Sequence, residues 1–167
     1  SSAASDVYKR QGWRDAMLAG EVINHSEGRP VLHAALRDPE QAMAREGVDA
    51  MAAQVDYLLS LGVEDIVSIG IGGSDLGPAM AVEALAPFHQ GPELHFISNI
   101  DPAHLSDCLA TLNPLTTAFI VISKTFTTME TLANMVMAKR WITDAGMTVS
   151  ERMIAVTAAA DQARQHG

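Results

Sequence analysis

Residues 65–78 read DIVSIGIGGSDLGP, a short run rich in β-branched residues that leads into a glycine-rich turn. β-Branched residues favour strands, and glycines directly after a strand let the backbone turn sharply and approach a ligand closely. A helix over Pro78–Leu85 is predicted next, with Pro78 in its first turn, where the missing N–H costs nothing. This stretch therefore predicts a strand, a glycine loop and a helix in immediate succession.

The same succession recurs along the rest of the chain. Further strands are predicted at 94–100, 117–123 and 152–157, and helices at 103–112, 128–143 and 160–166. Nearly continuous apolar strands are typical of a parallel sheet covered on both faces, and right-handed crossovers then give an open domain. The predicted fold class is α/β, a doubly wound parallel sheet. Its ligands are expected beyond the carboxyl ends of the strands.

The residues before this sheet are organised differently. Apolar residues recur at helical spacing, most clearly in 40–60, so residues 12–60 are expected to form a helical N-terminal segment whose last helix ends at Gly62. Residues 1–11 show neither helix nor strand periodicity, and we interpret them as a leader that is disordered or foreign to the protein. Both ends of the sequence look cut, so the domain over 61–167 is expected to be truncated at its C-terminus.

Composition and charge limit what this chain can be. It has 167 residues, 48% of them hydrophobic, and a net charge of −9 from 11 Lys and Arg against 20 Asp and Glu. The apolar content can fill a core, while the acidic balance argues against nucleic acids and anionic membrane surfaces as partners. No stretch approaches the ~18 apolar residues of a membrane span, and the single Cys108 cannot form an internal disulfide. A cytoplasmic protein that binds neither nucleic acid nor membranes is expected.

The first candidate site is the glycine loop over residues 70–78, GIGGSDLGP. A helix that follows a strand offers unpaired N–H groups and the positive end of its dipole to an anion. A dinucleotide fingerprint would require glycine in place of Asp75, and a Walker loop would require lysine in place of Pro78, so neither nucleotide motif is present. The alternative is a glycine turn needed only for close packing of strand and helix.

The second candidate site is 123–131, SKTFTTMET, which again leaves a strand and enters a helix. The hydroxyls of this loop, with backbone N–H groups, can surround a phosphate at the helix N-terminus, while Lys124 neutralises part of its charge. The alternative is a capping box, in which Thr127 and Glu130 satisfy the helix N-terminus without a ligand. A capping box explains two residues, so the crowding of four hydroxyls and a lysine favours the phosphate site.

Other candidate residues carry less weight. Residues 99–102 close a predicted strand, and they either line the ligand site or form an ordinary turn. The six histidines are scattered and match no zinc-binding spacing, so no metal site is expected. Cys108 lies on an amphipathic stretch and is expected to pack in the core.

The two loops resemble the signature stretches of the phosphoglucose isomerase family, in the same order and at a similar separation. Residues 23–37, INHSEGRPVLHAALR, and 98–101, SNID, also resemble segments of that family, so the resemblance runs from about residue 12 to the end. It implies a sugar isomerase (SIS) domain with a flavodoxin-like sheet. It also implies an aldose–ketose isomerase of glycolysis and gluconeogenesis that interconverts glucose 6-phosphate and fructose 6-phosphate. The reaction transfers a proton between C1 and C2 through a carboxylate base, with no metal or cofactor.

The resemblance further implies which residues bind the substrate. Those that would hold the phosphate, through hydroxyls, an ammonium or the backbone, are Ser123, Lys124, Thr125, Phe126, Thr127 and Thr128. Gly73 and Ser74 would face the sugar. The family's catalytic glutamate and ring-opening histidine are expected beyond Gly167, so this chain is expected to hold no catalytic residue and to be inactive by itself. The full-length protein is expected to be a homodimer, and the alternative function is a non-catalytic SIS module that senses phosphosugars.

Overall fold

The chain divides into two compact units, residues 1–55 and 56–167, and the boundary falls within the long helix α2 (Ala42–Ser60). The computed structural model describes residues 2–32, 34–38, 40–99 and 101–167. Besides the start of α2, the N-terminal unit contains α1 (Ser2–Leu18), an antiparallel bridge between Asn24 and Arg29, and the 3-10 turn η1 (Ala35–Arg37). All residues of the two candidate loops belong to the C-terminal unit.

The sequence predicts a disordered or foreign leader over residues 1–11. The described part of this stretch is not disordered, because it belongs to α1. Residues 6–15 are all exposed, so α1 buries no apolar face over most of its length, and periodicity could not reveal it. Alanine, lysine, arginine and glutamine favour helix locally without any packing, and this stretch contains all four. That residues 1–11 are foreign to the protein stays a prediction.

The C-terminal unit is built on a four-stranded parallel sheet, which confirms the predicted fold class. Its strands are β1 (Asp65–Ile69), β2 (Glu93–Ile97), β3 (Thr117–Ile122) and β4 (Met153–Val156). Their order across the sheet is β2-β1-β3-β4. The direction of winding therefore reverses between β1 and β3, and doubly wound sheets bind ligands outside the carboxyl ends of the two strands at that point.

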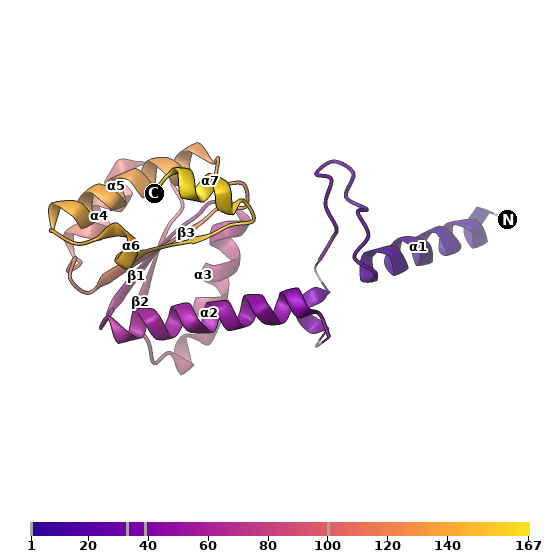
Figure 1. The fold of residues 1–167 in the computed structure, drawn as a ribbon, viewed down its shortest axis with the longest axis horizontal. Coiled ribbons are helices and arrows are strands. Elements are labelled where there is room, and N and C mark those ends of the chain that lie inside the picture. The colour runs from indigo at the N-terminus through magenta and orange to yellow at the C-terminus, as the bar shows by residue number, and fades with distance from the viewer. Residues whose placement is uncertain (1, 33, 39, 100) are drawn as a thin grey trace. The chain divides into compact units, whose positions relative to one another are not determined.

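Helices cover both faces of this sheet (Figure 1). Right-handed crossovers place α3 on one face, and α4 and α5 on the other. The bounds of the helical elements are α3 (Gly73–Leu85), η2 (Ala86–Phe88), α4 (Pro102–Ala110), α5 (Met129–Asp144), α6 (Val149–Arg152) and α7 (Ala160–Gln165).

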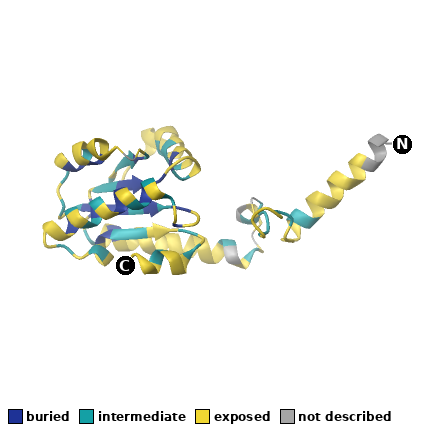
Figure 2. Cartoon of the chain, turned by 90° about the horizontal axis from the view of Figure 1, so that it is seen from above, coloured by how far each residue is buried: buried dark blue, intermediate teal, exposed yellow. Residues whose placement is uncertain are grey.

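The main core lies between the sheet and helices α4 and α5, where Figure 2 shows the buried residues gathered on the strands and on inward helix faces. Phe119 of β3 is fully buried there and meets Trp141 of α5 edge to face, with ring centroids 5.9 Å apart. Cys108 packs against this cluster, as expected from the sequence. A smaller cluster of Leu58, Val63 and Ala118 covers the other face.

Gly62 ends α2, as the sequence predicts. Its φ of +67° is a left-handed conformation that glycine adopts without strain. The N–H of Gly62 donates to the Leu59 carbonyl (3.1 Å), and the N–H of Val63 donates to the Leu58 carbonyl (3.4 Å). Together with the packing of Val63 against Leu58, these bonds form a Schellman motif that directs the chain into β1.

Two predicted boundaries are wrong. Helix α3 begins at Gly73, so Pro78 lies inside the helix and not in its first turn. Proline has no N–H, and the Ser74 carbonyl therefore lacks its usual helical donor. Strand β2 ends at Ile97, and the chain leaves the sheet earlier than the apolar run 94–100 suggested. Ile100 lies outside the described residues.

The thiol of Cys108 is expected to react slowly. Burial, and to a lesser degree the negative charge of Asp65, raise the pKa of Cys108 above its ordinary value. Only the thiolate is nucleophilic, so a raised pKa keeps the reactive fraction small until the pH exceeds the ordinary range of a cysteine. Iodoacetamide at pH 8 should alkylate the native chain several-fold more slowly than the urea-unfolded chain. Equal rates would show that the thiol is neither buried nor perturbed.

Candidate functional site

The second candidate loop joins β3 to α5 and is anchored by Ser123, which is buried. Its Oγ accepts a hydrogen bond from the Phe126 N–H (3.1 Å) and lies 3.4 Å from the Thr128 Oγ1, where either hydroxyl can be the donor. The backbone N–H of Ser123 donates to the Val156 carbonyl of β4 (3.1 Å). The loop is thus closed on itself by one hydroxyl and held to the neighbouring strand.

This loop turns through an unusual backbone conformation at Phe126. With φ at +55°, Phe126 is the one non-glycine residue with a positive φ in the part of the chain that the structure describes. A left-handed conformation costs such a residue roughly 1–2 kcal/mol. The ring is 2% exposed and belongs to the main core, so its burial offsets that cost. No sequence signal marks the position, because glycine or asparagine is the usual sign of a positive φ.

The remaining residues of the loop present polar groups to the outside. Lys124, Thr125 and Thr127 are exposed, and Thr128 is half-buried. The hydroxyls of Thr125 and Thr127 are 2.7 Å apart and bond to each other. One short loop therefore carries three threonine hydroxyls, the Ser123 hydroxyl and Lys124.

The N-terminus of α5, directly after this loop, carries no side-chain cap in the described structure. Thr128 is the N-cap residue, but its side chain makes no capping bond. The capping box between Thr127 and Glu130 is not formed, because the Thr127 hydroxyl bonds to Thr125 and lies outside the N-cap position. By contrast, the Asp101 carboxylate caps α4. The first-turn N–H groups of α5 have no acceptor within the helix and are available to an anion.

The first candidate loop joins β1 to α3. Gly72, the N-cap residue of α3, has φ +58° and ψ −122°, a conformation that residues with a side chain rarely adopt. Because glycine has no side chain, the N-terminus of α3 has no side-chain cap. Gly73 is exposed and Ser74 is half-buried, both at the start of the helix. Asp75 follows and is 9% exposed, and its Oδ1 has no hydrogen-bond partner among the described residues.

Gly70, the residue directly after β1, leaves no room for a side chain. A Cβ at Gly70 would lie 2.5 Å from the Ser74 carbonyl oxygen. We expect Gly70→Ala to lower the free energy of unfolding by about 1–3 kcal/mol, the usual cost of overpacking. Gly77→Ala is the matched control, because nothing lies within 4 Å of its Cβ and alanine favours a helix interior. Urea denaturation measures both, and equal midpoints for Gly70→Ala and the unaltered chain would contradict this prediction.

Both candidate loops leave the sheet at the same edge. β1 and β3 are parallel neighbours, paired from Asp65↔Thr117 to Ile69↔Val121, so their carboxyl ends lie side by side. Helices α3 and α5 start there on opposite faces of the sheet, and their N-terminal dipole ends flank the same pair of strand ends. The two loops therefore lie together at the switch point of the sheet, beyond the carboxyl ends of its two central strands.

Side-chain hydrogen bonds organise the described residues between β2 and α4. The Asn99 Oδ1 accepts a bond from the Asp101 N–H (3.2 Å), and the Asp101 Oδ1 accepts one from the Ala103 N–H (3.0 Å). Sequence reasoning missed a further contact: Asn134 of α5 donates through Nδ2 to the Asn99 carbonyl (2.7 Å). A polar residue within the buried stripe of an amphipathic helix is the signal that points to it.

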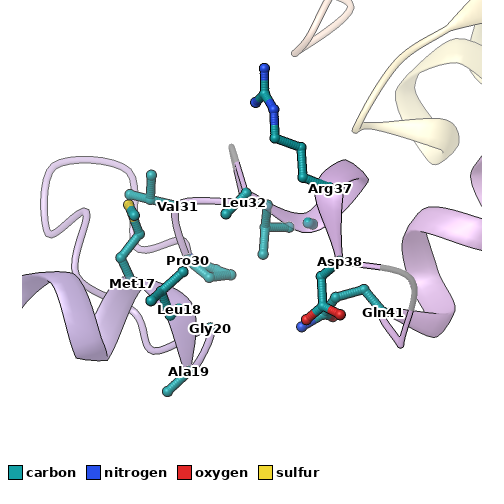
Figure 3. A pocket seen from close by; sticks show the side chains of 12 residues that line it. Met17, Leu18, Ala19, Gly20, Pro30, Val31, Leu32, Arg37, Asp38 and Gln41 are labelled. Carbon is teal, nitrogen blue, oxygen red and sulfur yellow. The ribbon is translucent and has the colours of Figure 1, made fainter.

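A hollow of about 400 Å³ in the N-terminal unit contains none of the predicted site residues. Apolar side chains of α1 and of the segment after the Asn24–Arg29 bridge form one side, and Asp38 and Gln41 lie at the other (Figure 3). Arg37 is its one basic residue, and in Figure 3 its side chain points away from Met17 and Leu18. The hollow therefore offers an anion far less than the loop at α5 does.

Two further features are absent from the residues that the structure describes. No helix there is both long and apolar enough to cross a membrane. Nor does that part of the chain bring three or more His, Cys, Asp or Glu side chains together as metal ligands.

Comparison with known proteins identifies similar sequences and structures. The family model described as Phosphoglucose isomerase matches residues 4–61 and 59–167. A glucose-6-phosphate isomerase of Brucella anthropi is 45% identical over 98% of this chain and 33% of its own length. One of Cereibacter sphaeroides is 47% identical over 92% of this chain and 32% of its own length. The crystal structure of a glucose-6-phosphate isomerase from Chlamydia trachomatis has a TM-score of 0.74 at 31% identity, covering 86% of this chain and 31% of that one.

Proposed function

Because the chain belongs to the phosphoglucose isomerase family, we propose that it supplies the phosphate- and sugar-binding loops of an enzyme that interconverts glucose 6-phosphate and fructose 6-phosphate. The chain spans about a third of the length of the curated relatives it matches. The observation that carries the proposal is the crowding of hydroxyls and Lys124 at the uncapped N-terminus of α5.

The second loop binds the phosphate in this proposal. In the structure its hydroxyls bond to one another, in the pairs Thr125–Thr127 and Ser123–Thr128. A phosphate exchanges these weak neutral bonds for bonds to a charged acceptor, which are about twice as strong. Lys124 adds a point charge, and the helix dipole of α5 favours the dianion. The Phe126 N–H now donates to the Ser123 Oγ. When this hydroxyl rotates toward the phosphate, the N–H becomes free to donate to a phosphate oxygen.

The first loop binds the sugar. Gly73 has no side chain, so a hydroxyl of the sugar can approach the backbone at the start of α3. Ser74 offers a hydroxyl that both donates and accepts, as a polyol requires. The two loops lie at one edge of the sheet and lead into helices on its opposite faces, which suits a ligand with a phosphate at one end and hydroxyls along the rest.

The isomerisation itself transfers a proton between C1 and C2 of the open-chain sugar. A base must lie within hydrogen-bond reach of that proton, roughly 3 Å away. None of the residues assigned to the two loops fills this role, and Glu130 belongs to the first turn of α5. We therefore place the base and the ring-opening histidine in parts of the full-length protein outside these 167 residues. The chain contributes binding and orientation.

The wider setting of the enzyme follows from the family. We propose a cytoplasmic enzyme of glycolysis and gluconeogenesis that acts as a homodimer, without metal or cofactor and without nucleic acid or membrane partners. The alternative is a non-catalytic module that senses phosphosugars. It would share the loops, and only an activity assay of a complete protein separates the two.

Calorimetric titration of the 167-residue chain tests the proposed binding. Fructose 6-phosphate should bind, inorganic phosphate should bind more weakly, and fructose should give no heat above dilution, because the phosphate supplies the charge that the second loop recognises. The binding should weaken as salt is added. Equal binding of fructose and fructose 6-phosphate, or no binding of either, would contradict the assignment.

A further inference from the structure

Asn134 is a buried polar residue within an apolar stripe. It lies on α5 between Thr131 and Ala138 and is 2% exposed. Its Nδ2 donates to the Asn99 carbonyl at 2.7 Å, whereas its Oδ1 has no partner among the described residues. A buried acceptor without a donor destabilises the fold, and a leucine at this place would remove that cost. Packing alone therefore does not account for an asparagine at this position.

The bond that Asn134 makes spans the switch point of the sheet. α5 follows β3, Asn99 follows β2, and β1 lies between these two strands. The side chain therefore ties the phosphate-binding helix to the end of β2 across the end of β1. A second bond fixes the same edge, since the Gly70 N–H donates to the Ile97 carbonyl (3.2 Å). The three strand ends are held together where the two loops begin.

We propose that Asn134 is a positioning residue for the sugar part of the site: it fixes the strand ends that carry the sugar loop relative to the helix that holds the phosphate. The inference rests on the proposed function. The phosphate itself contacts the second loop, which Ser123 and the Phe126 backbone hold without any help from Asn134. Loss of the Asn134 bond should therefore weaken binding of a phosphosugar far more than binding of phosphate alone.

The test compares two ligands on two variants of the 167-residue chain. Asn134→Leu removes the amide and fills the space with an apolar side chain, and Asn134→Ala covers the case in which leucine does not fit. We expect the affinity for fructose 6-phosphate to fall roughly tenfold, the factor that one intramolecular hydrogen bond supplies. Affinity for inorganic phosphate should stay within about twofold, and the melting temperature of Asn134→Leu should not fall.

Thr143→Val is the control on the same helix. The Thr143 hydroxyl bonds to the Lys139 and Arg140 carbonyls of α5 (3.1 and 2.9 Å), so its replacement leaves the bond from Asn134 to Asn99 intact. It should leave both affinities unchanged. Equal losses for both ligands in the Asn134 variants, or no loss in folded variants, would overturn the inference. If the unaltered chain binds neither ligand, the proposed function itself fails, which is a different and recognisable result.

Discussion

A chain that carries both Ser123→Ala and Thr128→Val should lose binding of fructose 6-phosphate while it stays folded. These two hydroxyls lie 3.4 Å apart at the entrance to α5, one from the end of β3 and one from the N-cap. A hydrogen bond to a charged group contributes about 1.5–3 kcal/mol. Loss of two such bonds corresponds to a decrease in affinity of roughly 100-fold or more. Calorimetry should then detect no binding at concentrations that saturate the unaltered chain.

The same experiment needs a control for the fold, because Ser123 also accepts the Phe126 N–H and helps to hold the loop. Circular dichroism and the melting temperature of the double variant should show an intact domain. Thr143→Val changes a threonine at the far end of α5, whose hydroxyl bonds only to carbonyls of its own helix (2.9 and 3.1 Å), and it should bind normally. Unchanged affinity in the folded double variant would rule out the second loop as the phosphate site.

The sheet could be predicted from the sequence because its strands are short, apolar and separated by strong turn signals. The apolar run of β3 and the glycines after β1 mark these two strands and the loops that follow them, at the carboxyl edge where doubly wound sheets bind ligands. The first half of α1, over residues 2–11, could not be predicted, since a helix that rests on local propensity without an apolar face has no periodicity to detect. The position of Pro78 was predicted wrongly for another reason. The preference of proline for the first turn of a helix is statistical, and α3 accommodates Pro78 in its interior.

The candidate site, like the fold, could be predicted from the sequence only in part. Which residues gather at α5 follows from their adjacency in the sequence, so residues 123–128 could be named without a structure. How the loop is held could not, because the bond from Phe126 to Ser123 depends on a positive φ at a phenylalanine. The contact of Asn134 with Asn99 joins residues 35 positions apart, and its partner is a backbone carbonyl, which any residue type supplies. The sequence marks Asn134 as a polar residue in an apolar stripe, but only the three-dimensional arrangement of the strand ends identifies its partner.

A chimera in which this chain replaces the matching third of the Brucella anthropi enzyme should interconvert the two hexose phosphates, while the 167-residue chain stays at background. Binding the ground state and the transition state equally does not raise turnover, so the loops alone lower no barrier. A positioned general base contributes typically 10²–10⁴-fold. In the chimera the relative's remaining two thirds supply that base, and this chain supplies the phosphate and sugar contacts.

The coupled assay for glucose 6-phosphate formation becomes decisive with two variants of the chimera. Ser123→Ala with Thr128→Val should reduce kcat/KM by the same factor by which it reduces affinity in the short chain, because the phosphate contacts are made in both ground and transition states. Glu130→Gln should leave kcat within a few-fold, since Glu130 lies in the first turn of α5 and is assigned no proton transfer. Turnover by the short chain that rises with its concentration and disappears in Glu130→Gln would make Glu130 the base. A silent chimera that still binds fructose 6-phosphate would instead favour the phosphosugar-sensing module, because its loops would then bind the ligand without orienting it for reaction.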